Sequence, residues 1–215
     1  MKILRTLRLI LQEFLPGDVD ALAGVLSDPE TMRFYPAPFD HAGIEDWIAR
    51  NRRRYAKDGH GLWAMVLKSS GELIGDCGLT IQDVEGVNEI EIGYHVRRDH
   101  WGQGFATEAA RACRDHGFAH LGVSRLVSII RPENIPSRRV AEKNGMTIWK
   151  EVTRVNLPHL VYAIRKEQSP SKIRRGWHSP ALERRIGSYT KSSSVSACFP
   201  PFHDASNSFW MNPAS

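Results

Sequence analysis

Residues 95–118 read HVRRDHWGQGFATEAARACRDHGF, and this stretch decides the fold more than any other. An apolar strand ends at Val96, a loop containing Gly102 and Gly104 follows, and a helix over 104–120 begins with almost no polar lead-in. Free backbone N–H groups and the positive end of the helix dipole favour an anion at such a joint. Glycine lets a ligand come close to the backbone because it has no Cβ, but a pair of glycines also serves an ordinary tight turn. The stretch therefore indicates either an anion site or a plain turn.

Two familiar phosphate-binding loops are excluded at this joint. The sequence contains no GxxxxGK[ST], so a nucleoside-triphosphate P-loop is absent. The third glycine of a dinucleotide-binding GxGxxG is replaced by Thr107, which Glu108 follows. The preceding strand is also the fourth along the chain, whereas the dinucleotide loop follows the first strand of a βαβ unit.

Apolar periodicity on either side of this stretch predicts seven strands and four helices. Strands are expected over 6–15, 62–68, 73–82, 88–96, 123–131, 146–155 and 157–166. Helices are expected over 17–28, 39–59, 104–120 and 136–145, the last of them stopped by Gly145. The buried side of the 104–120 helix is marked by Phe105, Ala109, Ala112, Cys113 and Phe118. This order predicts an α+β fold, with a largely antiparallel sheet and helices packed on its faces.

The composition is typical of a soluble globular protein. Hydrophobic residues make up 41% and charged residues 25% of the 215 residues, and one domain of ordinary size is expected. No apolar run approaches the roughly 20 residues of a membrane span. Cys77, Cys113 and Cys198 are too few and too widely spaced for a zinc pattern or a disulfide framework. A cytoplasmic location is therefore expected, because a reducing compartment suits such cysteines.

The net charge of +5 comes mainly from the last part of the chain. Residues 168–215 hold six Lys or Arg and two acidic residues, which leaves 23 Lys or Arg against 22 Asp or Glu in the remainder. A nucleic-acid surface is therefore not supported for the body of the protein. Residues 168–215 are rich in Ser and Pro and lack periodicity, so we expect a disordered basic tail beside a domain of residues 1–167. Aromatic residues in the tail, such as Trp177 and Trp210, leave a docking segment as the alternative.

Two motifs resemble the GNAT superfamily of N-acetyltransferases. That family carries [Q/R]-x-x-G-x-[G/A] at this strand–helix joint, and here the six positions are Trp101 to Ala106. Trp at the first position is characteristic of the branch similar to ribosomal-protein-alanine N-acetyltransferases, whose GYxxxxxxWGxGxATEA resembles GYHVRRDHWGQGFATEA here. A second segment, RPENIPSRRVAEKNGM, resembles the xxENxxSxxVxEKxGF of the same branch, with Met146 where Phe is usual. The likeness covers residues 6–166 and leaves the tail outside.

The resemblance implies a sheet that splays apart between its fourth and fifth strands to admit acetyl-CoA, with no metal. Gly93 in the fourth strand suits a bulge that helps this splay, or else it is a packing glycine. The implied reaction transfers the acetyl group to a primary amine by direct attack in a ternary complex. The alternative is an acetyl-CoA-binding sensor or an inactive relative. The implied cofactor-binding residues are Val96, Trp101, Gly102, Gln103, Gly104, Phe105, Ala106, Thr107, Asn134 and Ser137.

Acetyl transfer to an amine needs a base for the amine, stabilisation of the tetrahedral oxyanion and departure of the thiolate. Glu91 matches an acidic position common in this branch, so we expect it to orient or deprotonate the amine; Glu89 is the fallback, and a solvated strand face is the plain alternative. Many family members place a Tyr acid where Ala141 stands here. Ser137 is then the candidate near the sulfur, although Ser also favours helix N-termini, and Asn134 either bonds the pantetheine or caps the same helix. His95 and His100 are expected to be structural or exposed rather than catalytic.

The acceptor is not determined at this level. Acetyl-CoA and an amine are the implied partners, with neither a membrane nor DNA among them, and a homodimer is left open. The basic run RNRRRYAK over 50–57 is either a solvated helix face or a contact for ribosomal RNA or an acidic protein. A protein N-terminus, an amino acid and an antibiotic amine all remain candidate acceptors.

Overall fold

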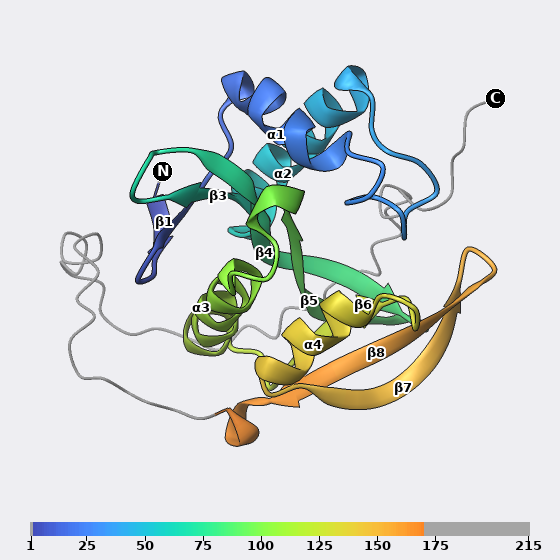
Figure 1. Ribbon diagram of the computed structural model, residues 1–215. Coiled ribbons are helices and arrows are strands. Elements are labelled where there is room, and N and C mark those ends of the chain that lie inside the picture. The colour runs from blue at the N-terminus through green and yellow to red at the C-terminus, as the bar shows by residue number, and fades with distance from the viewer. Residues whose placement is uncertain (1, 170–215) are drawn as a thin grey trace, which may run out of the picture. The chain divides into compact units, whose positions relative to one another are not determined.

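The computed structural model describes residues 2–169, which form one eight-stranded sheet and the helices that cover it (Figure 1). The strands are β1 (Lys2–Arg5), β2 (Leu9–Gln12), β3 (Leu62–Leu67), β4 (Leu73–Val84), β5 (Val87–Val96), β6 (Arg125–Ile130), β7 (Thr147–Arg154) and β8 (Leu157–Arg165). The helices are α1 (Val19–Leu26), α2 (His41–Asp58), α3 (Phe105–His120) and α4 (Ile135–Lys143), with short 3-10 turns at Pro16–Asp18, Arg98–His100 and Lys166–Gln168. The strand order is β1-β2-β3-β4-β5-β6-β8-β7, and only β5 and β6 pair in parallel. The predicted α+β class is confirmed.

Helices cover both faces of the sheet, as predicted. The side chains of β3 alternate between the two cores that these helices form with the sheet. Leu62 and Ala64 pack with α1 and α2, in a core that includes Leu22, Ile44 and Trp47. The intervening Trp63 and Met65 point into the core beneath α3, among Phe105, Ala109, Cys113 and Phe118. Successive side chains of a strand point to opposite faces, so one apolar strand serves two cores.

The sequence predicted seven strands, and the structure has eight because β1 lies before the first predicted strand and pairs with it as a hairpin. The expected strand over 6–15 corresponds to β2, and its first residues form the hairpin turn instead: the backbone N–H and the hydroxyl of Thr6 both bond the carbonyl of Leu9, at 3.0 and 3.3 Å. β1 and β2 then pair as antiparallel strands on either side of this turn. The apolar alternation continues through the turn, where Leu7 is 86% exposed, so periodicity alone could not reveal the break.

The sheet splays between β5 and β6, the fourth and fifth predicted strands. These strands share a single pairing, Glu91 with Val127. Side chains cross the gap instead: the Ser128 hydroxyl donates to the carbonyl of Ile92 at 2.8 Å, and the Ile129 N–H donates to the Glu91 carboxylate at 3.2 Å. Residues 93–96 of β5 therefore diverge from β6, which leaves their outer edge open to a ligand.

Gly93 is a packing glycine and not a bulge. β5 keeps an unbroken register with β4 from Val87 to Val96, and Gly93 pairs with Gly78. A Cβ on Gly93 would come within 3.2 Å of the Leu62 side chain. Of the two readings of Gly93, the structure therefore supports close packing against β3.

Cys77 on β4 and Cys113 on α3 meet in the core with their sulfur atoms 3.5 Å apart, both as free thiols. Burial raises the pKa of the Cys77 thiol well above its usual value, so it stays protonated. Within residues 2–169, no helix has the length and apolar character needed to cross a membrane. The predicted disordered tail, the docking alternative and Cys198 lie outside the described residues.

Candidate active site

The start of α3 offers unpaired backbone donors at the open end of β5. Gly102 and Gly104 adopt positive φ angles of 72° and 82°, which only glycine reaches at little cost. The first bond of the helix runs from the Glu108 N–H to the carbonyl of Gly104 at 3.0 Å, and no side chain caps the helix at Gly104. The N–H groups of residues 105–107 precede that bond and point out of the helix end. A Cβ added to Gly102 would meet no atom within 4 Å, so this loop faces open space.

A network from the β1–β2 turn holds this loop in place. The Glu108 carboxylate accepts hydrogen bonds from the Thr6 hydroxyl at 2.6 Å and from the Arg8 N–H at 2.8 Å, and it pairs with the Arg8 guanidinium at 2.7 Å. Arg8 also donates to the carbonyl of Gln103 at 3.0 Å and lies 4.2 Å over the ring of Phe105. Burial raises the pKa of Glu108, but the bonds from Thr6 and Arg8 outweigh that effect and lower it overall. Sequence reasoning missed Thr6 and Arg8, because nothing in the local sequence links them to a helix about 100 residues away.

The remaining loop residues gather at the same end of β5. The Trp101 indole N–H donates to the carbonyl of Val96 at 2.6 Å, which closes the loop onto the strand. The Gln103 side chain bonds the carbonyl of Asp99 at 3.1 Å. The structure thus brings together eight of the ten predicted cofactor residues: Val96, Trp101, Gly102, Gln103, Gly104, Phe105, Ala106 and Thr107.

The other two, Asn134 and Ser137, begin α4. The Asn134 side chain accepts a hydrogen bond from the Ser137 N–H at 3.2 Å, so Asn134 does cap this helix. The hydroxyl of Tyr94 on β5 donates to the carbonyl of Ser137 at 2.8 Å and ties α4 to the open strand edge. Burial raises the pKa of Tyr94, so it remains a phenol. Ala141, where many relatives have Tyr, is 1% exposed in the core.

The two strand carboxylates predicted as bases have different surroundings. Glu89 forms a two-pronged ion pair with Arg125, whose guanidinium stacks 3.9 Å over the ring of Trp149. Glu91 sits at the splay, where it accepts the Ile129 N–H, and burial raises the pKa of its carboxyl. Arg154, the Ile129 N–H, His95 and Arg54 pull that pKa partway back. Glu89 is therefore engaged in an ion pair, while Glu91 combines a raised pKa with a place at the opening.

His95 shares the face of β5 that carries Glu91, and its side chain is only 9% exposed. Its Nδ1 lies 2.7 Å from the carboxylate of Asp76 on β4, and its Nε2 lies 2.5 Å from the hydroxyl of Tyr35. The other oxygen of Asp76 accepts the indole N–H of Trp47 at 3.0 Å. His100 lies elsewhere, with its Nε2 3.0 Å from the Arg97 guanidinium. Sequence reasoning missed Asp76 and Tyr35, which come from separate segments.

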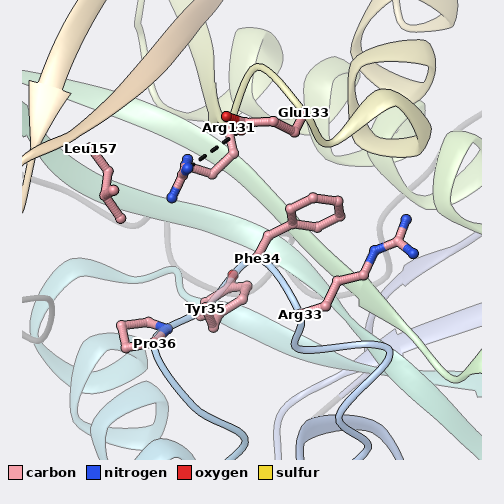
Figure 2. A pocket seen from close by; sticks show the side chains of 7 residues that line it. All are labelled: Arg33, Phe34, Tyr35, Pro36, Arg131, Glu133 and Leu157. Carbon is pink, nitrogen blue, oxygen red and sulfur yellow. Dashed lines mark ion pairs between the residues drawn. The ribbon is translucent and has the colours of Figure 1, made fainter.

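A pocket of about 310 Å³ opens beside Tyr35 (Figure 2). Three segments form it: the loop between α1 and α2, the start of the β6–α4 loop, and the first residue of β8. Its lining residues are Arg33, Phe34, Tyr35, Pro36, Arg131, Glu133 and Leu157. Arg131 and Glu133 form an ion pair at 3.4 Å across one wall, and the Nε of Arg131 is buried without a hydrogen-bond partner among the described residues.

The basic run over 50–57 is partly exposed to solvent and partly buried against the rest of the fold. Arg53 and Lys57 are exposed, but Arg50 and Arg54 are half-buried. Burial lowers the pKa of Arg50 to about 10, and its guanidinium lies 5.3 Å from the centre of the Trp47 ring. The solvated-face reading therefore holds for part of this run only, and contact with RNA or an acidic protein stays a prediction.

Comparison with known proteins shows the family to which this architecture belongs. Residues 8–147 match the family model described as an acetyltransferase (GNAT) domain. YkkB of Bacillus subtilis (strain 168), an uncharacterised protein, is 40% identical over 146 residues, covering 67% of this chain and 85% of YkkB.

Solved structures share the fold. An acetyltransferase from Agrobacterium tumefaciens str. C58 superposes with a TM-score of 0.68 and 30% identity, over 77% of this chain and 95% of the other. The ribosomal-protein-S5-alanine acetyltransferase of Vibrio fischeri gives 0.59 at 15% identity, over 78% of this chain and 98% of the other. The likeness inferred from residues 93–109 and 131–146 is thereby confirmed at the level of the family.

Proposed function

Because the chain belongs to the GNAT acetyltransferase family, we propose that it transfers the acetyl group of acetyl-CoA to a primary amine by direct attack in a ternary complex. The family implies acetyl transfer from acetyl-CoA, and the amine and the direct attack are our proposal. The observation that carries it is the uncapped N-terminus of α3, with Gly102 and Gly104, at the splayed end of β5. This arrangement favours the anion reading of the loop over the plain turn.

The loop residues fit the pyrophosphate of acetyl-CoA. The N–H groups of residues 105–107 are unpaired within the helix, and the open space at Gly102 leaves room for phosphate oxygens. Arg8 adds a guanidinium whose Nη2 would lie 3.6 Å from a Cβ on Gly104. The pantetheine arm, which carries amide groups, is expected along the free edge of β5 near Tyr94 and Val96, with Asn134 and Ser137 on the other side.

Glu91 is the proposed base for the amine. Its carboxylate lies at the splay, and its raised pKa makes it a better proton acceptor than an exposed Glu. The overall reaction converts an ammonium and acetyl-CoA into an acetamide, free CoA thiol and one proton. The nitrogen attacks the thioester carbonyl carbon, and the C–S bond breaks with its electron pair going to sulfur.

Ser137 is the proposed hydroxyl near the leaving sulfur. It lies in the first turn of α4, where the helix dipole also favours a developing thiolate, and the hydroxyl of Tyr94 bonds its backbone carbonyl. Many family members have a Tyr that acts as the acid at the position of Ala141. Here the buried Ala141 offers no hydroxyl, so the acid must come from elsewhere.

The pocket beside Tyr35 is the proposed acceptor site. The name of the Vibrio fischeri neighbour suggests a protein N-terminus as one acceptor to try, and amino acids and antibiotic amines are others. A cytoplasmic location is part of the same proposal, supported by two buried free thiols that a reducing compartment would maintain. The homodimer stays a prediction.

The test uses the full chain. Calorimetry with acetyl-CoA, ATP and NAD measures ligand choice, and release of CoA thiol is followed with an N-terminal alanine peptide, a free amino acid and an aminoglycoside. We expect binding of acetyl-CoA alone, and a decrease in kcat of about 100-fold in Glu91→Gln with unchanged acetyl-CoA affinity. Glu89→Gln is the matched control, since it also neutralises a strand carboxylate and should keep kcat.

The possible results of these experiments bear on different parts of the proposal. If a folded protein binds no acetyl-CoA, the loop is only a turn and the proposal is wrong. Binding without transfer to any amine would favour the sensor or inactive relative. Equal kcat for Glu91→Gln and the wild-type protein would remove Glu91 from the mechanism and leave the transfer itself standing.

A further inference from the structure

Arg131 puts a poorly compensated positive charge on the wall of the pocket beside Tyr35. Its side chain is only 20% exposed, and its carboxylate partner is Glu133, with 3.4 Å between Nη2 and Oε2. A hydrogen bond between charged groups normally measures about 2.7–2.9 Å, so this pair is loose. The Nε of Arg131 is buried without a hydrogen-bond partner among the described residues. Because a charge withdrawn from water needs close partners, a second anion in the pocket would stabilise this guanidinium.

The neighbouring charges leave this end of the pocket positive. Arg33 also lines the pocket, but it forms its own ion pair at the surface, which compensates its charge. Burial lowers the pKa of His159 on β8, and the charges of Arg131 and Arg154 lower it further. Glu133 raises that pKa, but by less than either guanidinium lowers it. An anion is therefore favoured beside Arg131, and a further cation is not.

Much of the remaining lining is apolar. Figure 2 shows Arg131 on one wall and Pro36 on the opposite wall, with Leu157 and the ring of Phe34 contributing further apolar surface. The volume of about 310 Å³ lies at the lower end of the roughly 300–1,000 Å³ of small-molecule sites. A pocket of this size and lining fits one apolar side chain together with a carboxylate on Arg131.

The pocket lies next to the proposed base. The Ile129 N–H bonds the Glu91 carboxylate at 3.2 Å, and Arg131 follows two residues later along the chain. The Cα atoms of residues 129 and 131 are therefore at most about 7 Å apart. On the other side of the pocket, burial raises the pKa of Tyr35 and the charge of Glu91 raises it further, so Tyr35 also lies within reach of this carboxylate. One bound molecule can thus present an amine toward Glu91 and a carboxylate to Arg131.

We propose that the acceptor is a free amino acid with an apolar side chain, whose carboxylate binds the guanidinium of Arg131 in this pocket. Its role as the acceptor rests on the proposed acetyl transfer. The nitrogen–carbonyl bond forms as the C–S bond breaks, so the ammonium form of the amino acid and acetyl-CoA become the N-acetylamino acid, CoA thiol and one proton. An aminoglycoside lacks the carboxylate, and a peptide carries an amide at that position instead. Arg131 therefore selects the amino acid among the three kinds of acceptor considered above.

The first experiment measures binding without transfer. Calorimetry of the full chain with CoA, which has no acetyl group to transfer, compares leucine with leucinamide, in which a neutral amide replaces the carboxylate. We expect leucine to bind about 100-fold more tightly, because the amide loses the charge-assisted bonds to the guanidinium. Arg131→Gln should remove this difference, and Arg131→Lys should keep part of it, since Lys retains the charge without the planar fork of donors.

The second experiment measures kcat/KM for acetylation of the same two amines. The wild-type protein should prefer leucine by about 100-fold, although the amine of leucinamide loses its proton more readily. Arg131→Gln should raise the KM for leucine by about 100-fold and leave kcat/KM for leucinamide within about 3-fold of the wild-type value. Arg125→Gln is the matched control: Arg125 begins the strand that Arg131 follows, is 23% exposed and pairs with Glu89, so the preference for leucine should persist.

Equal binding of leucine and leucinamide to the wild-type protein, or a preference for leucine that survives Arg131→Gln, would overturn the role of Arg131 and leave the acetyl transfer intact. Faster acetylation of a peptide with an N-terminal leucine than of free leucine would overturn the choice of acceptor. If the wild-type protein acetylates none of the amines, the proposed function is wrong, and calorimetry still decides whether the pocket binds an amino acid through Arg131.

Discussion

The cofactor side and the acceptor side that we propose for this protein are built in different ways. On the cofactor side, the donors are mostly backbone N–H groups of the contiguous residues 102–107. On the acceptor side, the polar groups belong to side chains from four separate segments, namely the α1–α2 loop, β4, β5 and the β6–α4 loop; they are Tyr35, Asp76, Glu91, His95 and Arg131. A backbone site needs only glycines and a helix start at fixed spacing, whereas a side-chain site needs residues that meet through the fold. A site built from backbone groups can therefore be predicted from the sequence, whereas a site built from distant side chains cannot.

The largest expected effect is on acetyl-CoA affinity, and it tests the backbone donors of the proposed cofactor site. Gly104→Ala should weaken acetyl-CoA binding by about 10- to 100-fold, because a Cβ at this position strains a φ of 82° in the loop proposed to bind the pyrophosphate. Gly86→Ala in the β4–β5 turn is the control, since it carries the same strain at φ 83° with no atom near its Cβ. Calorimetry compares the two. Equal affinities would mean that the loop does not approach the cofactor.

A second prediction separates the two strand carboxylates. Glu89→Gln should lower the free energy of unfolding by about 2 kcal/mol, because it breaks a largely buried ion pair and leaves Arg125 without its charge partner. Thermal unfolding measures the loss, and kcat should stay at the wild-type value. A large fall in kcat with normal stability would reverse the roles assigned to Glu89 and Glu91.

His116 on α3 gives a pH-dependent test of the scaffold. Burial, together with His120 and His60, lowers its pKa to about 4, against about 6.5 in an unfolded chain. The unfolded state therefore binds the proton more tightly between these values, so the contribution of His116 is complete above pH 6.5 and lost as the pH falls towards 4. Allowing for solvent screening of a half-buried ring, the loss should be about 1 kcal/mol.

His116→Gln should remove that part of the acid sensitivity, measured as the change in Tm between pH 7.5 and 4.5, while exposed His41→Gln should not. Neither change should alter kcat. An effect of His116→Gln on kcat at neutral pH would show that α3 contributes more than a rigid helix start.

The smallest effect concerns the stability cost of Glu91. Its raised pKa means that the folded state holds the proton more tightly than the unfolded state, so stability falls as the pH rises through that pKa. Glu91→Gln keeps an acceptor for the Ile129 N–H without the charge, and should raise Tm by about 2 °C at pH 8, with the gap closing below pH 4. A lower Tm of Glu91→Gln at pH 8 would indicate that the ionised Glu91 stabilises the fold, through its hydrogen bond to the Ile129 N–H between β5 and β6.

Much of the fold could be predicted from the sequence because it rests on local rules. The end of β5 at Val96, the start of α3 after Gly104 and the stop of α4 near Gly145 all follow from periodicity and glycine conformations. The β1–β2 hairpin was missed for the complementary reason, since its turn at residues 6–8 keeps the apolar alternation of a strand. The role of Gly93 needed the register with Gly78, which no periodicity contains.

By itself, then, the sequence determined the order of the elements and the loop that resembles a GNAT cofactor site, because both are properties of neighbouring residues. Only the tertiary structure decided which long-range partners meet. It assigned Glu89 to Arg125, set Arg8 against Glu108, and linked Asp76, His95 and Tyr35. Hydrogen bonds and burial depend on distances in space, and pairs 19 to 100 residues apart in the chain acquire those distances only when the sheet has formed.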